Sequence, residues 1–413
     1  MKYPNLLPRF LKYVKVNSRS DEHADRFPST EREERFQKEV ILPDLEKLGL
    51  SDVHYNQQSG CVIAEVPANI TADVPVMGFL AHCDTADFNA ENVQPQVHEN
   101  YDGKSKIQLG DSEFYLDPAV FPNLKKYQGQ TIITASGDTL LGGDDKTGVA
   151  ELITLAEYLL THPEVKHGKI RFAFTPDEEI GTGAQHFDVP EFSADFAFTV
   201  DGEEPGKLDW DTFSAAAFSL DIQGVNVHPA VAKDQMINAI QVGINFQNQL
   251  PQDEVPEKTS GRQGFFHLDN FQGTVDNAHL DYIVRDFERD GLEKRKNLVK
   301  EIVAKMNAAF DSERIKLEMH DQYYNMADEL AKHMDIVNIA RKAYQEEGLT
   351  INEDPVRGGT DGSQLTYMGL PCPNLFAGQE NMHGRFEYTV LESMEKAVDV
   401  MVRMVQLNAE NHH

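Results

Sequence analysis

Cysteine is scarce in this chain: three cysteines among 413 residues cannot supply a disulfide framework. Positive charge is also in short supply, with 38 Lys and Arg against 68 Asp and Glu and a formal net charge of −30. Nucleic acids and anionic membranes bind basic surfaces, so this balance argues against either as a partner. The few cysteines favour a reducing compartment, and we therefore expect a cytoplasmic protein.

Long apolar runs are missing as well, and none approaches the roughly 20 residues that a membrane span needs. The N-terminal segment is interrupted by Arg9, Lys12 and Lys15, which is typical of an amphipathic helix and not of a signal peptide. Hydrophobic residues make up 40% of the chain, enough for sizeable cores. The length exceeds the roughly 100–200 residues of one domain, so we expect at least two.

Helix and strand patterns alternate in the first half of the chain. A capping box at Thr30 and Glu33 opens one helix, and another follows Thr147. Apolar stretches of strand length lie at 61–66, 74–81, 170–175 and 194–200. Such strands, separated by helices, indicate an α/β fold with a mixed, mostly parallel sheet and helices on both faces. We assign this domain to residues 1–213 and 323–413, with a β-rich excursion near 100–139.

The pattern between residues 214 and 322 is different. Strands and helices follow there in the order β-α-β-β-α-β, which is the ferredoxin-like arrangement. We therefore expect a separate α+β domain inserted into the first. Its edge strands could pair across a two-fold axis, so we expect that a homodimer could form through this domain.

Histidine and acidic residues gather where the predicted strands end. Sheets of α/β proteins build their sites at this edge, so side chains from different strands would meet there. Singly, each motif has an ordinary alternative, such as a helix N-cap for Asp144 or Asp145. Three adjacent acids at 177–179 are harder to explain as surface, because their repulsion calls for a cation. The residues expected to cluster are His82, Asp84, Asp144, Glu178, Glu179, Asp201 and His383.

Two histidines and several carboxylates, without cysteine, suit a hydrolytic site that holds two metal ions. In such sites the ions lie about 3.5–4 Å apart and share a carboxylate. Zinc is the expected metal, and Mn²⁺ or Co²⁺ would accept the same ligands. Neighbouring carboxylates such as Glu178 and Glu179 point in different directions, so one can bind a metal while the other moves a proton.

These motifs resemble the dinuclear zinc exopeptidase family that includes carboxypeptidase G and several dipeptidases and deacylases. The resemblance covers nearly the whole chain and rests on residues 82–87, 140–151, 175–184, 200–210, 226–239, 357–374 and 381–387. It implies a zinc-catalytic domain with an inserted lid, and an aminopeptidase that acts on short peptides, preferentially tripeptides. A dipeptidase, carboxypeptidase or N-deacylase is the alternative, since metal motifs do not fix which end of the substrate is recognised.

The resemblance also implies roles for single residues. The metal ligands would be His82, Asp144, Glu179, Asp201 and His383. Asp144 would bridge both metals, Asp84 would orient His82, and Glu178 would be the general base. The family has a cis peptide bond after the bridging acid, here between Asp144 and Asp145. A protein that kept this fold without catalysis would lack the bridge or the base, and both are present.

Three further residues are candidates for contacting the substrate. His228 precedes a helix, and similar family members place a histidine there, sometimes from a partner subunit, to stabilise an oxyanion. Arg285 or Arg357 would bind the terminal carboxylate of the peptide through two parallel hydrogen bonds. The alternatives are a plain turn at His228-Pro229 and a surface ion pair between Arg285 and Asp286.

Overall fold

The computed structural model describes residues 2–412, which divide into two compact units. Among the described residues, unit 1 consists of 2–210, Asp328–Glu353 and 360–412, and unit 2 consists of Asp211–Ala327 and Asp354–Gly359. The insertion expected over 214–322 lies inside unit 2. Residues 354–359 belong to this unit as well, because Val356 forms a β-bridge with Thr212.

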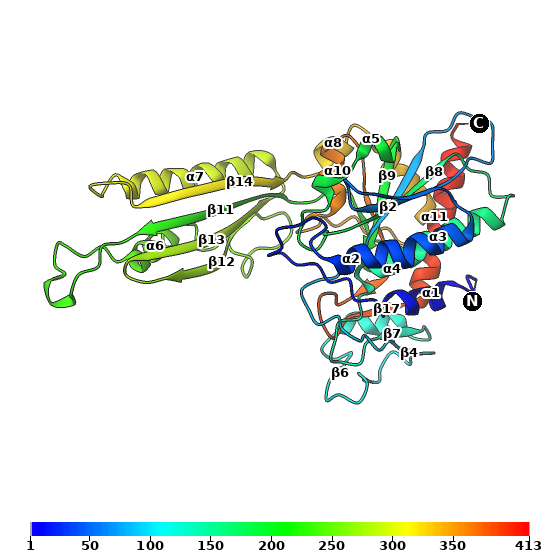
Figure 1. Ribbon diagram of the computed structural model, residues 1–413, viewed down its shortest axis with the longest axis horizontal. Coiled ribbons are helices and arrows are strands. Elements are labelled where there is room, and N and C mark those ends of the chain that lie inside the picture. The colour runs from blue at the N-terminus through cyan, green and yellow to red at the C-terminus, as the bar shows by residue number, and fades with distance from the viewer. Residues whose placement is uncertain (1, 413) are drawn as a thin grey trace. The chain divides into compact units, whose positions relative to one another are not determined.

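A seven-stranded mixed sheet forms the centre of unit 1, and its strands β2, β8 and β9 are labelled in Figure 1. The strand order is β1-β2-β8-β3-β9-β15-β10. Its strands are β1 (Ser51–Asn56), β2 (Cys61–Val66), β3 (Met77–His82), β8 (Ile170–Thr175), β9 (Phe196–Gly202), β10 (Leu208–Asp209) and β15 (Asn374–Phe376). The four central strands β8, β3, β9 and β15 run parallel, and the outer pairings are antiparallel. The expected mixed sheet is confirmed, with its parallel part confined to the centre.

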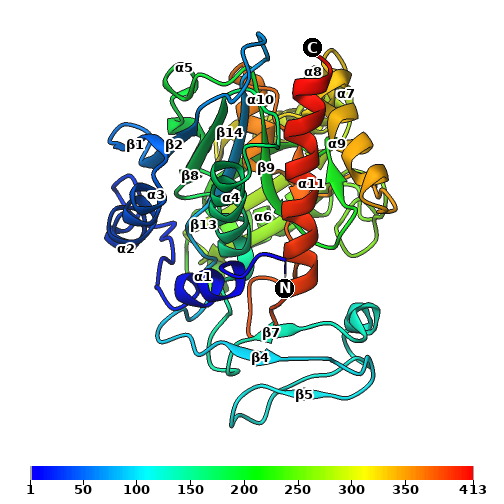
Figure 2. The same ribbon diagram turned by 90° about the vertical axis from the view of Figure 1, so that its right-hand side faces the viewer.

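Helices cover both faces of this sheet, as predicted. Successive side chains of a strand point to opposite faces, so Phe79 and Leu80 enter different cores. The core around Phe79 includes α4 (Gly143–Thr161), α9 (Met334–Glu346) and α11 (Leu391–Glu410). The core around Leu80 includes α5 (Val189–Phe192), η3 (Ala184–His186) and α10 (Asp361–Tyr367). Helices α4 and α11 lie side by side over the sheet (Figure 2).

The N-terminal segment forms the predicted amphipathic helix, α1 (Leu6–Tyr13). Leu6, Phe10 and Tyr13 are buried on one face, at helical spacing. On the other face, Arg9 and Lys12 form ion pairs with acidic side chains. Among the described residues, no helix combines the length and apolarity that crossing a membrane requires.

The next helical segment begins with the predicted capping box. The Thr30 hydroxyl accepts from the Glu33 N–H, and the Glu33 carboxylate accepts from the Thr30 N–H. The segment runs through α2 (Glu31–Arg35), a π-helical stretch η1 (Phe36–Ile41) and α3 (Leu42–Leu48). It ends at Gly49, whose φ of 84° is left-handed and favours glycine.

The β-rich segment near 100–139 supports the loop that carries His383. A second sheet has the order β16-β17-β7-β4, and a separate hairpin joins β5 and β6. These elements are β4 (Gln96–His98), β5 (Ile107–Gln108), β6 (Tyr115–Leu116), η2 (Pro122–Tyr127), β7 (Ile132–Thr134), β16 (Gln379–Glu380) and β17 (Tyr388–Val390). Because β17 pairs with β7, the hairpin between β16 and β17 is anchored to this excursion.

Unit 2 has the predicted β-α-β-β-α-β order. Its elements are β11 (Ser214–Gln223), η4 (Pro229–Val231), α6 (Ala239–Gln247), β12 (Phe265–Gly273), β13 (Asn277–Asp286), α7 (Arg289–Asn307) and β14 (Ile315–Tyr323). The chain returns to unit 1 within α8 (Ala327–Leu330). The antiparallel sheet has the order β12-β13-β11-β14. Helices α6 and α7 lie along this sheet (Figure 1) and share one core with it. In that core the rings of Phe218 and Tyr282 stack at 4.5 Å.

Candidate metal centre

The predicted ligands converge at the carboxyl edge of the unit 1 sheet, where parallel strands end. His82 is the last residue of β3, Asp201 lies near the end of β9, and Glu179 follows β8. Asp144 lies in the first turn of α4, and His383 lies in the loop between β16 and β17. Residues separated by up to 301 positions in the sequence, from His82 to His383, are thus brought together by one sheet edge and one hairpin.

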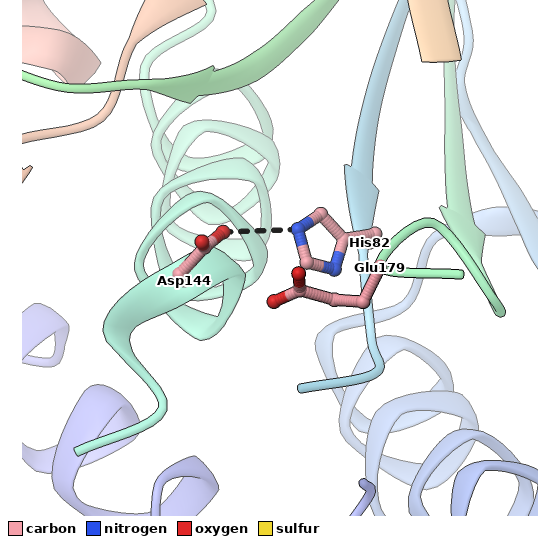
Figure 3. A group of neighbouring side chains, drawn as sticks. All are labelled: His82, Asp144 and Glu179. Atoms are coloured by element: carbon pink, nitrogen blue, oxygen red, sulfur yellow. Dashed lines mark hydrogen bonds and ion pairs between the residues drawn. The ribbon is translucent and has the colours of Figure 1, made fainter. Parts of the chain in front are cut away.

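Asp144 lies between the two histidines. Its Oδ1 is 3.0 Å from Nε2 of His82, and its Oδ2 is 3.0 Å from Nε2 of His383. Figure 3 shows the first contact, with Glu179 beside it. The His82 nitrogen is also 3.5 Å from Oδ1 of Asp201, and the His383 nitrogen is 3.0 Å from Oε2 of Glu179. The Asp144 carboxylate therefore lies between two pairs of possible metal ligands, His82 with Asp201 and His383 with Glu179.

The donor set fits divalent cations. Ligand atoms of His82, Asp144 and Glu179 lie within 4.8 Å of one another, and so do those of His82, Asp145 and Asp201. Imidazole and carboxylate are ligands that zinc, manganese and cobalt accept. Oε1 of Glu179 is buried without a hydrogen-bond partner among residues 2–412, whereas buried polar atoms normally have one. A cation beside Glu179 would satisfy this oxygen.

The electrostatics of the site point the same way. Burial, reinforced by the neighbouring Asp144 carboxylate, raises the pKa of Glu179 to about 7 and that of Asp201 to about 6. Burial also raises the pKa of Glu178 well above its ordinary value. Hydrogen bonds to Asp144 and Glu179 raise the pKa of His383 to about 11. These groups hold protons tightly because the site is short of positive charge, which metal ions would supply.

Asp84 links His82 to the turn after β8. Nδ1 of His82 lies 3.1 Å from the backbone oxygen of Asp84 and 3.3 Å from its Oδ1. The carboxylate also accepts from the backbone N–H groups of Glu178 at 3.0 Å and of Glu179 at 3.1 Å. The link to His82 is the one expected from the sequence. The two backbone bonds were not expected, and they fix the position of the 178–179 turn.

Asp144 and Asp145 have different environments, although the sequence left the N-cap role open to both. The peptide bond between them is cis, as the resemblance implies. Oδ1 of Asp145 accepts from the Gly148 N–H at 2.9 Å, and its Oδ2 accepts from the His82 N–H at 3.2 Å. Asp145 therefore takes the capping role, and the Asp144 side chain is left facing the histidines.

Glu387 is a site residue that the sequence did not reveal. Its buried carboxylate accepts from the backbone N–H groups of Leu141, Gly142 and Asp144, at 2.8, 2.8 and 2.9 Å. The hairpin that carries His383 is thereby tied to the loop that presents Asp144. Glu387 lies in one of the motifs behind the resemblance, but its role depends on backbone donors that no residue type signals.

Gln379, in β16, is a second residue that was missed. Its Nε2 donates to Oδ1 of Asp201 at 2.9 Å and to Oδ1 of Asp144 at 3.3 Å. The amide therefore connects two of the predicted ligands and orients their carboxylates. A lone glutamine among ordinary loop residues carried no signal of this position.

All three residues predicted to contact the substrate belong to unit 2, and His228 and Arg285 are described first. His228 is exposed, and its Nδ1 accepts from the Ala230 N–H at 3.2 Å, which is the turn considered as an alternative. Arg285 donates to Oε1 of Gln322 at 2.8 Å. The alternative ion pair between Arg285 and Asp286 is wrong for the described part of the chain, because Asp286 pairs with Arg295.

Arg357 also belongs to unit 2, where it fastens a loop. Its Nη1 donates to the carbonyl groups of Gly261 at 2.6 Å and Gln263 at 3.0 Å, and its Nη2 donates to Oγ1 of Thr259 at 2.8 Å. The guanidinium also lies 5.1 Å from the ring centre of Phe213. Both terminal nitrogens are therefore engaged in contacts that hold the 259–263 loop.

Comparisons with known proteins agree with the resemblance. Residues 141–407 match the family model of peptidase family M20/M25/M40. Peptidase T of Lactobacillus helveticus is 78% identical over 410 residues, which cover 99% of each chain. The fold is shared with the solved aminopeptidase PepT of Bacillus cereus (TM-score 0.77, 20% identity) and a tripeptidase of Staphylococcus aureus (TM-score 0.78, 19% identity), each match covering 98% of both chains. The chain belongs to peptidase family M20/M25/M40.

Proposed function

We propose that this chain is a metal-dependent aminopeptidase that hydrolyses the N-terminal peptide bond of short peptides, preferentially tripeptides. The observation that carries this proposal is the Asp144 carboxylate, whose two oxygens contact His82 and His383 separately. Such an arrangement suits a hydrolytic site with two metals. Membership of the peptidase family and the 78% identity to a peptidase T support the same activity.

The cofactor that we propose is a pair of zinc ions, for which Co²⁺ or Mn²⁺ could substitute. His82 and Asp201 would hold one ion, Glu179 and His383 would hold the other, and Asp144 would contact both. Each ion would then have three protein ligands, the number usual in catalytic zinc sites. When bound, such ions lower the pKa of a water molecule and polarise the carbonyl group of the substrate.

Glu178 is the proposed general base. Its carboxylate would take a proton from the attacking water as the new C–O bond forms, and would deliver it to the leaving amine as the C–N bond breaks. The raised pKa that burial gives to Glu178 makes it a stronger base than an exposed glutamate. Asp84 supports this role by holding the Glu178 backbone N–H at 3.0 Å.

We assign recognition of the substrate to residues of unit 2. His228 would stabilise the oxyanion that forms when the carbonyl group is attacked. Either Arg285 or Arg357 would bind the terminal carboxylate. Arg285 is the stronger of the two candidates, because its hydrogen bonds within the described chain come from Nη1 alone, whereas Arg357 uses both terminal nitrogens.

The peptide end that is recognised can be tested with one tripeptide in three forms. We expect the unmodified tripeptide to be cleaved, and acetylation of its N-terminus to abolish cleavage, because an aminopeptidase must recognise the free amine. The C-terminal amide should be cleaved more slowly, since it cannot accept two hydrogen bonds from an arginine. Rates are measured by chromatography of the products. Equal rates for the acetylated and free peptides would instead favour a deacylase or carboxypeptidase.

The stability of the metal-free chain should fall as the pH rises. Without metal, the pKa values of Glu179 and Asp201 are about 7 and about 6, above the roughly 4 of unfolded carboxyl groups. The folded chain then binds more protons than the unfolded chain, so stability is lost as the pH rises from about 4 to about 7. The raised pKa of His383, about 11, acts in the same direction above about pH 6.5.

The measurement is a melting temperature between pH 5 and pH 8, with added zinc and after chelation. We expect the difference in melting temperature between the zinc-loaded and the chelated sample to increase with pH. The chelated sample loses stability as the pH rises, and deprotonated ligands bind metal more tightly. A gap that stays constant or narrows would contradict the assignment of these residues as ligands. The same samples, assayed with the tripeptide, should be active only with metal.

We further propose that the enzyme is cytoplasmic and forms a homodimer through unit 2. The three cysteines, Cys61, Cys83 and Cys372, are buried and unpaired, which suits a reducing compartment. In unit 2, β12 and β14 are the edge strands of the sheet, and edges of this kind can pair with a second copy. The excess of acidic residues supports a small peptide as the partner, with neither nucleic acid nor membrane.

A further inference from the structure

We propose that Glu33 is a positioning residue for catalysis, because it holds the turn that carries Glu178 and Glu179. Glu33 lies in the N-terminal part of the chain, outside the 141–407 region that matches the family model. This inference deepens the proposed function and rests on the assignment of Glu178 as the general base. Four observations on the molecule support it: the burial of Glu33, the separate bonding of its two oxygens, the run of amides in the turn and a returning bond from Ser29 to Asp177.

The burial of Glu33 exceeds what a helix cap needs. A capping glutamate in the first turn of a helix usually reaches back to the N-cap residue while remaining near solvent. Here the side chain is fully buried, and Oε1 accepts from the Thr30 N–H at 3.0 Å, the Thr30 hydroxyl at 2.7 Å and the Ser29 hydroxyl at 3.0 Å. One oxygen therefore serves the cap completely, and the second is available for another contact.

That second oxygen reaches the end of strand β8. Oε2 of Glu33 accepts from the backbone N–H of Asp177 at 3.1 Å, across 144 positions of sequence. A returning bond runs from the Ser29 N–H to Oδ2 of Asp177 at 2.8 Å. The start of α2 and the turn after β8 are thus joined by two hydrogen bonds in opposite directions, both of them buried.

Three successive amides of this turn point at protein carboxylates. The N–H of Asp177 donates to Glu33, and those of Glu178 and Glu179 donate to the two oxygens of Asp84. Consecutive N–H groups of this kind form a concavity that binds anions. The φ of Asp177 is 57°, a left-handed conformation that is uncommon outside glycine, so the turn needs support.

Glu33 and Asp84 divide this support between them. Asp84 also contacts His82, so its loss would disturb the metal site directly. Glu33 contacts no predicted ligand. It acts through Asp177, with whose backbone N–H and side chain it interacts. A displacement of about 1 Å can lower a catalytic rate about 100-fold. Loss of Glu33 should therefore impair the proton transfers of Glu178 and should affect substrate binding much less.

The test compares Glu33→Ala with a matched control, Glu392→Ala. Glu392 also accepts a backbone N–H and a hydroxyl, both from Thr131, near the start of α11. We expect Glu33→Ala to lower kcat about 10- to 100-fold with little change in KM, and the control to keep the wild-type kcat. Hydrogen exchange, measured by mass spectrometry on a peptide that spans 177–179, should accelerate in Glu33→Ala only.

Wild-type kcat and wild-type exchange in Glu33→Ala would overturn the inference, as would an equal loss of kcat in the control. If the alanine variant does not fold, Glu33→Gln decides, because its single acceptor oxygen cannot serve both the cap and the turn. If hydrogen exchange in Glu33→Gln is as slow as in the wild type, both at the Thr30 cap and in the 177–179 peptide, the inference is overturned. Failure of the proposed function is distinguishable, since it would appear as wild-type turnover in a variant of Glu178 itself.

Discussion

Replacing Glu178 by alanine should nearly abolish peptide hydrolysis while leaving the metal content unchanged. A well-placed base accelerates a reaction by about 10²–10⁴-fold, and here the same carboxylate is assigned both proton transfers. The metal should stay because Glu178 is not one of the five residues proposed to hold the ions. Its loss removes a half-buried carboxylate from a site rich in negative charge and leaves all five proposed ligands in place.

The measurements for this variant are kcat with a tripeptide and metal content by elemental analysis. Glu178→Asp is the matched variant, since it keeps a carboxylate that is shorter by one methylene group. We expect Glu178→Asp to retain more activity than Glu178→Gln, which has the size of glutamate but cannot accept the proton. Hydrolysis close to the wild-type rate in Glu178→Ala would show that another group is the base.

Strands buried on both faces were the most predictable part of the fold. The apolar runs at 61–66 and 170–175 coincide with β2 and β8 at both ends, because nearly all of their side chains are buried and most are apolar. The edge strand β1 (Ser51–Asn56) was missed, since it is exposed or half-buried throughout and shows no apolar run. The short strands β10 and β15 were missed as well, because two or three residues carry no periodicity.

Site residues were predictable where their side-chain type carries the chemistry. Histidines and carboxylates at strand ends stand out in a sequence, and the structure brings His82, Asp144, Glu179, Asp201 and His383 together. The roles of Glu33 and Glu387 at the site could not be found in this way, because the groups that tie them to it are backbone amides, which every residue except proline offers. The bonds they form span 144 and up to 246 positions, so only the folded chain reveals them.

Replacing Asp144 by alanine should remove both activity and metal. Its two oxygens contact different histidines, each at 3.0 Å, so the single change takes a ligand from both ions. His82 with Asp201 and His383 with Glu179 would remain, which leaves two ligands for each ion where a catalytic zinc site has three. The two remaining pairs would also lose the carboxylate that holds their ions close together.

Metal content after dialysis, together with kcat, separates this variant from Glu178→Ala. We expect less than one tightly bound ion for each Asp144→Ala chain, and a loss of turnover that added zinc does not restore. Asp201→Ala is the matched control: it shortens one ligand set only, so it should lose one ion and keep the other. Two retained ions in Asp144→Ala would contradict the bridging role, since both ions would then be held without the carboxylate that lies between the histidines.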